Sequence, residues 1–163
     1  MARASSKRSA TLQAYADPAE MPASEATRVA MLLAIDEPDI RSDVQLARLV
    51  AGGLLPASAV ALAEVLGQHR VVGPVVPEAT LRRVRRGRKV LSRQHSERLY
   101  ELGRVVDAVS RAYHGDRDAI EAFLSRPHPL LDGETPFDMV RSSSAGAEAV
   151  LNLIRRAEAG VAV

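Results

Sequence analysis

The chain has 163 residues, of which 47% are hydrophobic and only 3% aromatic, and it contains neither Trp nor Cys. Ala, Leu and Val must therefore fill the interior, which favours closely packed helices in one domain or in two small domains sharing a core. The absence of Cys excludes disulfides, thiolate metal sites and a cysteine nucleophile, and the formal net charge of +2 does not by itself mark a nucleic-acid binder.

Residues 1–23 are rich in Ala, Ser and Pro and show little apolar periodicity. They predict a flexible arm. The basic start over residues 1–8 is not followed by an apolar stretch, so it does not indicate a secretory signal. No apolar run approaches the roughly 20 residues that span a bilayer. We therefore expect a cytoplasmic protein.

Three short helices are predicted next, over residues 24–35, 42–51 and 56–66. Ser24 is a good N-cap for the first, and Val44 is expected among the inward-facing apolar positions of the second. A proline or glycine follows each helix within three residues and stops it.

Residues 68–76 break this pattern because they lack helical periodicity. Valines flank the turn signal of Gly73 and Pro74. Two interpretations stay open, a short strand pair or an irregular connection.

Helices dominate the rest of the chain. The predicted starts, each a capping residue or a proline of the first turn, are Pro77, Ser92, Asp116 and Thr135, and the run of serines over residues 142–144 leads into the last helix. The helix from Ser92 is the longest and should continue to His114. The sequence thus predicts an all-α fold with a flexible arm (1–23), a helical domain (24–91) and a second helical domain (92–163) that begins with the long helix.

The densest positive charge lies in the helix after Pro77 and in the turn that follows it. Leu81 and Val84 are expected to face inward, while Arg82 and Arg86 lie on the opposite side. Such a helix fits a DNA groove, where arginines neutralise phosphates and contact guanine edges. The alternatives are a solvated charged face or a surface for an acidic protein. The DNA-binding candidates are Thr80, Arg82, Arg83, Arg85, Arg86, Arg88 and Lys89.

Catalytic and metal-binding patterns are not visible in the sequence. The four histidines are His69, His95, His114 and His128, and none pairs with another at helical spacing, as a zinc site would require. There is no Gly-rich phosphate loop and no recognisable Ser/His/Asp set. We therefore expect no enzyme activity, no metal and no cofactor.

The most specific motif lies in the C-terminal third. It reads Pro129-Leu130-Leu131-Asp132-Gly133-Glu134-Thr135-Pro136, preceded by Phe123-Leu124 and followed by Gly146-Ala147 and Ala157-Glu158-Ala159-Gly160. This pattern resembles the toxin-binding domain of Xre/MbcA/ParS-like antitoxins. Weaker likenesses at residues 53–56, 62–67, 80–83 and 91–99 extend the resemblance upstream, so that it covers roughly residues 43–163. Residues 68–76 match poorly, and Glu78 stands where the family often has a basic residue.

The resemblance implies an antitoxin with an Xre-like, helix-turn-helix N-terminal domain. Family members inhibit RES-domain toxins, which consume NAD or transfer its ADP-ribose, by blocking the toxin's active-site cleft with the C-terminal helix and tail. Carried over to this sequence, the toxin-binding residues are Arg155, Arg156, Glu158, Gly160, Val161, Ala162 and Val163. The expected partners are a RES-domain toxin, promoter DNA bound for autorepression, and a second copy of the chain within a hetero-oligomeric complex. The alternative is a stand-alone helix-turn-helix transcription regulator without a toxin.

Overall fold

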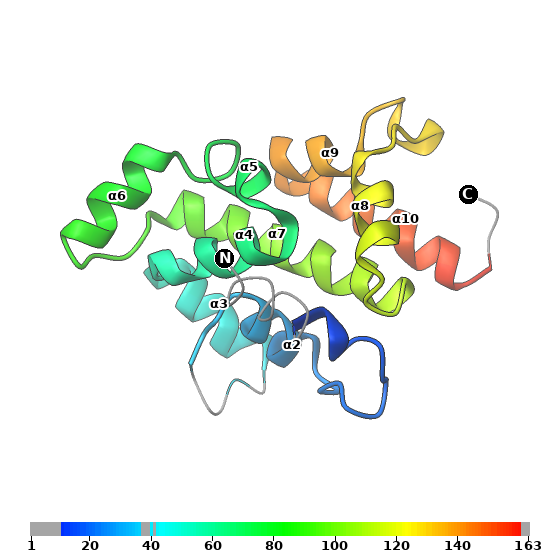
Figure 1. The fold of residues 1–163 in the computed structure, drawn as a ribbon, viewed down its shortest axis with the longest axis horizontal. Helices are drawn as coiled ribbons and strands as arrows, with labels where there is room; N and C mark the ends of the chain where they lie inside the picture. Colours follow the sequence, from blue (N-terminus) through cyan, green and yellow to red (C-terminus); the bar gives the residue numbers. More distant parts are fainter. Residues whose placement is uncertain (1–10, 37–39, 41, 161–163) are drawn as a thin grey trace.

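The computed structural model describes residues 11–36, 40 and 42–160, and this part of the chain is all-α, as predicted, with no strand (Figure 1). The elements are α2 (Glu25–Leu32), α3 (Asp43–Gly52), α4 (Pro56–Leu66), α5 (Gln68–Val71), α6 (Glu78–Arg86), α7 (Arg93–Ala112), α8 (Arg117–Ser125), the 3₁₀ turn η1 (Pro129–Leu131), α9 (Pro136–Ser142) and α10 (Ser144–Glu158).

Side-chain caps fix most of the helix starts. A hydroxyl or carboxylate accepts a hydrogen bond from a backbone N–H two or three residues ahead, which satisfies a donor that has no partner inside the helix. The capping residues are Ser24, Ser42, Ser92, Asp116, Thr135 and Ser143. The predicted starts of these helices are correct within one residue for this reason.

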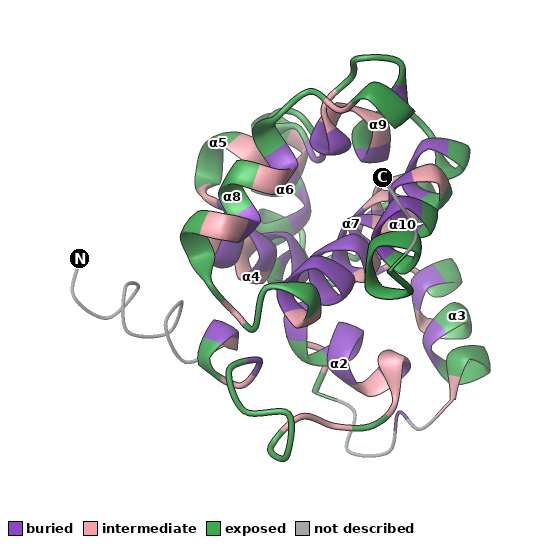
Figure 2. Ribbon diagram, turned by 90° about the vertical axis from the view of Figure 1, so that its right-hand side faces the viewer, coloured by how far each residue is buried: buried purple, intermediate pink, exposed green. Residues whose placement is uncertain are grey.

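The long helix α7 runs through the middle of the molecule (Figure 1). Helices α2, α3 and α4 pack against it from one half of the chain, and α9 and α10 pack against it from the other. Its inward face is apolar, and Leu99, Val105, Val106 and Val109 are fully buried. Buried residues line the sides of α7 and α10 that face each other (Figure 2). The two halves of the chain therefore share one core, and their division at residue 91 stays a prediction.

Two residues in the described part of the expected arm, Leu12 and Tyr15, are packed onto this core. Leu12 and Tyr15 are each only 5% exposed, and the Tyr15 hydroxyl donates a hydrogen bond to Asp107 in α7. The backbone carbonyl of Leu12 lies so close to Gly115 that a Cβ there would be 2.1 Å from the oxygen. These contacts correct the expectation of a flexible arm at Leu12 and Tyr15, whereas residues 16–20 are exposed. Residues 1–10 lie outside the described residues.

The irregular stretch after α4 contains one turn of helix, α5, that its sequence did not predict. A single bridge between Val72 and Val76 closes the turn that follows, and the Val75 and Val76 side chains are buried. The strand-pair interpretation is therefore wrong. Val44, expected in the core, is instead 60% exposed on α3; in this helix Leu46 and Val50 supply the contact with the core.

No single helix among the described residues is long and apolar enough to cross a membrane. The bent pair α3 and α4, at 111° to each other, reaches the required length and composition only when the two are taken together.

Candidate functional site

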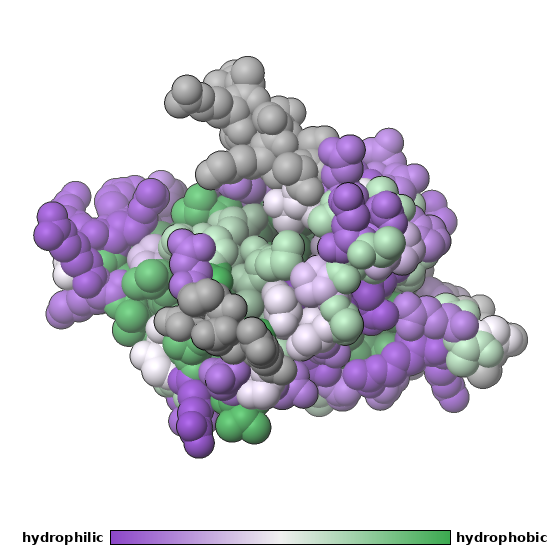
Figure 3. All heavy atoms as spheres, turned by 90° about the horizontal axis from the view of Figure 1, so that it is seen from below, coloured by the Kyte–Doolittle hydropathy of each residue, from purple (hydrophilic) through white to green (hydrophobic). Residues whose placement is uncertain are grey.

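The two surfaces expected to carry function lie at opposite ends of the molecule's long axis. Helix α6 forms one end, and the C-terminal part of α10 lies toward the other (Figure 1). Seen from below, strongly polar residues cover the α6 end, with hydrophobic residues directly beside them (Figure 3). A ligand on one surface therefore leaves the other open.

Helix α6 is attached to the body by a narrow apolar edge. Leu81 and Val84 are buried, and this edge faces α4. Every predicted DNA-binding arginine of α6 is exposed, and Thr80 is half-buried. Arg82 donates to Glu78 over 3.1 Å, so the carboxylate one turn upstream offsets part of the positive charge at the start of the helix. Arg88 and Lys89 follow in the exposed turn.

Helix α10, unlike α6, buries a broad apolar face and exposes a polar outer face. Val150, Leu151, Leu153 and Ile154 are buried in a helix that packs on α7 and α9. The predicted toxin-binding residues Arg155, Arg156, Glu158 and Gly160 are all exposed at its end. Val161, Ala162 and Val163 lie outside the described residues.

The two arginines near the end of α10 differ in how firmly they are held. Arg155 donates to Glu148 over 3.2 Å and to Asn152 over 3.0 Å. Partial burial opposes ionisation of Glu148, but the hydrogen bond from Arg155 and the charge of Arg104 outweigh it and lower the pKa of that carboxyl. Arg156 forms no hydrogen bond or ion pair with any described residue. Its side chain is therefore the better placed of the two to bind another molecule.

The proline-rich motif forms a tight connection between α8 and α9. The ring Nδ1 of His128 accepts a hydrogen bond from the backbone N–H of Leu130, and Asp132 has left-handed backbone at φ 53°. Thr135 then caps α9 and donates from its hydroxyl to Asp138 over 2.8 Å. The motif thus sets the angle at which α9 leaves the loop.

Gly146 explains the Gly-Ala pair in the last helix. A Cβ at this position would lie 2.1 Å from the carbonyl oxygen of Met139, a distance that real side chains do not tolerate. Only glycine lets the backbones of α10 and α9 approach this closely. The pair of helices therefore depends on this residue.

An apolar cleft of about 390 Å³ between the end of α7, α8 and α10 was not predicted from the sequence. The Tyr113 and Phe123 rings lie 6.0 Å apart there, tilted by 49°. The chain has only five aromatic residues, and two of them line this cleft. Their closeness in the sequence is the one signal that could have pointed to it. The lining residues are Ala112, Tyr113, Ala119, Ala122, Phe123, Arg126, Pro127, His128, Leu153, Ile154 and Ala157.

Arg70 in α5 is a second residue that sequence reasoning missed. It donates to the Glu121 carboxylate and the Ser125 hydroxyl in α8, and its guanidinium lies 5.0 Å from the centre of the Phe137 ring in α9. The side chain is only 11% exposed. Arg70 therefore joins the N-terminal half of the chain to the C-terminal half.

These features define a small helical subdomain with an exposed polar helix end and an open apolar cleft beside it. Residues 110–160, about a third of the chain, match the family described as the antitoxin Xre/MbcA/ParS C-terminal toxin-binding domain. The resemblance predicted from the sequence is confirmed, and the match supports an antitoxin role. It includes every residue that lines the cleft and all of α8, α9 and α10. No curated protein matches the chain.

Proposed function

We propose that this chain is an antitoxin without catalysis of its own, and that it inhibits a RES-domain toxin by placing the end of α10 and the residues that follow it in the toxin's active-site cleft. The observation that carries the proposal is the match of residues 110–160 to a toxin-binding domain. The RES identity of the toxin and the plugging mechanism come from the resemblance of the sequence motifs.

The end of α10 suits this role because one side of the helix is packed in the core and the other side is exposed. Leu153 and Ile154 anchor the last turns in the core, while Arg156 and Glu158 are exposed. Gly160 has a positive φ of 72°, the left-handed conformation in which glycine commonly ends a helix. A rigidly held helix end loses little freedom on entering a concave site, so more of the contact energy contributes to affinity.

The test is inhibition of NAD consumption by a purified RES-domain toxin, ideally the one encoded in the neighbouring reading frame. Deleting Val161–Val163 or making Arg156→Glu should raise the concentration needed for half inhibition. The matched control is Arg48→Glu, which reverses another exposed arginine without a described partner, on α3. If both α10 variants inhibit as well as the unchanged chain, the plugging mechanism is wrong.

We propose further that the chain represses its own promoter through α6. Four exposed arginines on a short helix that projects from the body favour this function, because such a helix can enter the major groove while the arginines neutralise phosphates. A stand-alone transcription regulator remains the alternative to an antitoxin. Inhibition of the toxin distinguishes the two.

The DNA proposal is tested by titrating the promoter fragment at several salt concentrations. Arg83→Ala together with Arg86→Ala should weaken binding and reduce the slope of log affinity against log salt by roughly two, about one for each arginine that no longer neutralises a phosphate. Arg48→Ala on α3 is the control. An unchanged slope would show that α6 does not bind the DNA.

A further inference from the structure

The apolar cleft between the end of α7, α8 and α10 has a volume of about 390 Å³, in the lower part of the roughly 300–1,000 Å³ range of ligand-binding pockets. Leu153 and Ile154, both buried in α10, line it. The partly buried Phe123 ring of α8 and the Tyr113 ring after α7 line it as well, and Tyr113 is 39% exposed. The described residues therefore leave aromatic surface in this cleft uncovered, and an apolar group that covers it gains hydrophobic stabilisation.

The nitrogen groups of the cleft side chains are available as hydrogen-bond donors. Arg126, which follows α8, is exposed, and its side chain forms no hydrogen bond or ion pair with any described residue. The His128 ring accepts the Leu130 N–H at Nδ1, so the proton of the neutral ring is on Nε2. Among the described residues, those that line the cleft include no Asp or Glu. The cleft therefore suits an apolar group with a carboxylate beside it.

Helix α8 is held in place from a face that does not line the cleft. Arg70 of α5 donates to Glu121 and Ser125, which are one helical turn apart and lie on a different side of α8 from Phe123. The wall that carries Phe123 is therefore fixed before a partner arrives. A preformed wall loses little conformational freedom on binding, so more of the contact energy contributes to affinity.

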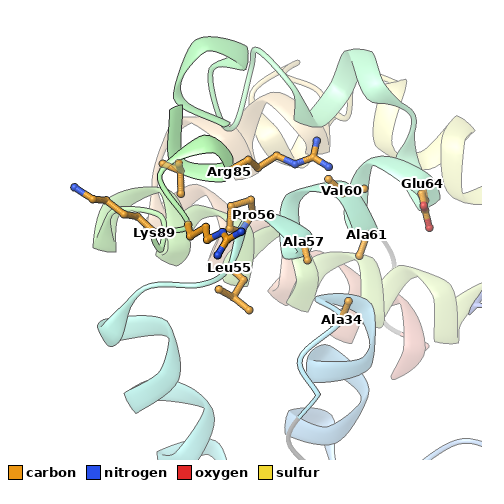
Figure 4. A pocket seen from close by; sticks show the side chains of 11 residues that line it. Ala34, Leu55, Pro56, Ala57, Val60, Ala61, Glu64, Arg85 and Lys89 are labelled. Atoms are coloured by element: carbon orange, nitrogen blue, oxygen red, sulfur yellow. The ribbon is translucent and has the colours of Figure 1, made fainter. Parts of the chain in front are cut away.

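The other hollow large enough for a partner is the α4 groove, about 580 Å³ between α4 and the end of α6 (Figure 4). Arg85 extends toward Val60 across it, and Arg88 and Lys89 line it as well. These bases belong to the surface proposed for DNA, and the described residues that line the groove include no aromatic side chain. The groove also lies outside residues 110–160, which match the toxin-binding family. The cleft is therefore the better site for the toxin.

We propose that the cleft binds a segment of the toxin in which a large apolar side chain lies next to an Asp or a Glu. The apolar side chain packs against the Phe123 and Tyr113 rings, and the carboxylate pairs with Arg126. The choice of partner rests on the proposed function, in which the end of α10 blocks the active site of the same toxin.

One toxin molecule can occupy the cleft and contact the end of α10 at the same time. Ile154 and Ala157 of α10 line the cleft, and Arg156 is exposed in the same turns of the helix. Aromatic contacts that become buried often dominate the affinity of an interface, whereas a helix end that fills an active site keeps the substrate out. The two surfaces then have different tasks: the cleft supplies affinity and the end of α10 supplies inhibition.

The experiment measures two quantities for the full chain and a purified RES-domain toxin: the Kd by isothermal titration calorimetry, and the inhibition of NAD consumption. Ala122→Trp fills the cleft from an exposed position on α8, and Arg126→Glu places a like charge against the toxin's carboxylate. Each should raise the Kd roughly tenfold or more. Arg126→Lys keeps the charge and should raise it less.

Inhibition at saturating concentrations separates the cleft from the end of α10. The Ala122→Trp and Arg126→Glu proteins should still inhibit the toxin completely once enough is added, because their α10 is unchanged. Deleting Val161–Val163 should have the opposite effect: the shortened chain binds nearly as tightly but inhibits incompletely even at saturation.

Two control variants make the same chemical changes in the α4 groove. Ala57→Trp adds the same side chain at an exposed alanine of α4, and Lys89→Glu reverses an exposed base. Both should leave the Kd for the toxin unchanged. Thermal unfolding of every variant checks that it is folded.

The outcomes distinguish the cleft from the plugging mechanism. If Ala122→Trp and Arg126→Glu bind the toxin as tightly as the unchanged chain, the cleft proposal is wrong, and plugging stands if the deletion still reduces inhibition. If both weaken binding but the unchanged chain binds without stopping NAD consumption, the cleft stands and plugging is wrong. A loss of affinity in Ala57→Trp instead would assign the toxin to the α4 groove. An unchanged chain that does not bind the toxin would overturn both proposals.

Discussion

The hydroxyl of Tyr15 donates a hydrogen bond of 2.9 Å to the Asp107 carboxylate in the middle of α7, although the two residues are 92 positions apart. Arg28 binds the same carboxylate through Nε at 2.8 Å and Nη2 at 3.2 Å, and Arg111 approaches it to 3.4 Å. Asp107 is 1% exposed. This buried network holds the N-terminal segment and α2 on α7, the helix from which α10 is also supported.

Asp107→Ala should reduce the free energy of unfolding by about 3–5 kcal/mol, because it leaves the Arg28 charge buried without its counter-ion. Arg28 would keep only its bonds to the carbonyls of Pro22 and Ala23. Urea denaturation followed by circular dichroism measures the change. Glu97→Ala, which breaks an exposed pair with Arg93, should cost less than about 1 kcal/mol. Equal effects of the two substitutions would contradict a structural role for the buried network.

Tyr15 gives the chain a dependence on alkaline pH. Burial, reinforced by the neighbouring charge of Asp107, raises the pKa of Tyr15 far above its ordinary value. The folded protein therefore keeps a proton that the unfolded chain loses near pH 10, so the stability from this group is complete below that pH and falls as the pH rises above it. The expected loss is about 1.4 kcal/mol per pH unit above pH 10.

Tyr15→Phe tests this dependence, because Phe cannot ionise in either state. Unfolding free energies measured between about pH 9 and about pH 11 should fall less steeply in the variant than in the unchanged chain. Tyr100, whose pKa burial also raises, is present in both proteins and cancels in the comparison. Parallel curves would show that Tyr15 is ionised as easily in the folded protein as in the unfolded chain.

Gly146→Ala should destabilise the protein by about 1–3 kcal/mol, since the added methyl group meets the Met139 carbonyl and forces α10 away from α9. Toxin binding should weaken in the same variant, because both helices lie within the matched domain. Gly52→Ala at the end of α3 is the matched control, as a Cβ there meets nothing within 4 Å. A Gly146→Ala protein as stable as this control would mean that α9 and α10 do not need their close approach.

Arg70→Ala should lower the free energy of unfolding by roughly 2 kcal/mol, because the variant lacks the bonds to Glu121 and Ser125 and the stacking on Phe137. Arg70→Lys should recover only part of this, since an ammonium cannot reproduce the planar fork. Arg82→Ala, which removes an exposed pair on α6, is the control and should change stability by less than about 1 kcal/mol. Thermal unfolding of the three variants makes the comparison.

Local signals made much of this fold predictable. Ser24, Ser92, Asp116 and Thr135 mark helix starts by their own capping chemistry, which does not depend on the rest of the chain. Val44 was wrongly expected in the core. Its helix, α3, buries only Leu46 and Val50, and hydropathy alone does not show which of its apolar residues face inward. The packing of Leu12 and Tyr15 was missed for a related reason, since Gly115 and Asp107, which they contact, lie about a hundred residues away.

The candidate site was predictable where it is a motif and not where it is assembled by the fold. The pattern over residues 129–136 indicated the toxin-binding domain, and the family match confirms it. The cleft beside Phe123 is formed by three helices, so no short stretch of sequence contains it. Arg70 looked like any surface arginine, because its partners in α8 and α9 become neighbours only after folding.

Amide hydrogen exchange of the full chain, alone and bound to a purified RES-domain toxin, tests the central claim most directly. We predict slower exchange at the C-terminal end of α10 and around the cleft it shares with α8, with α6 unchanged. Slower exchange confined to α6 and the α4 groove, with α10 exchanging as it does in the free chain, would contradict the account.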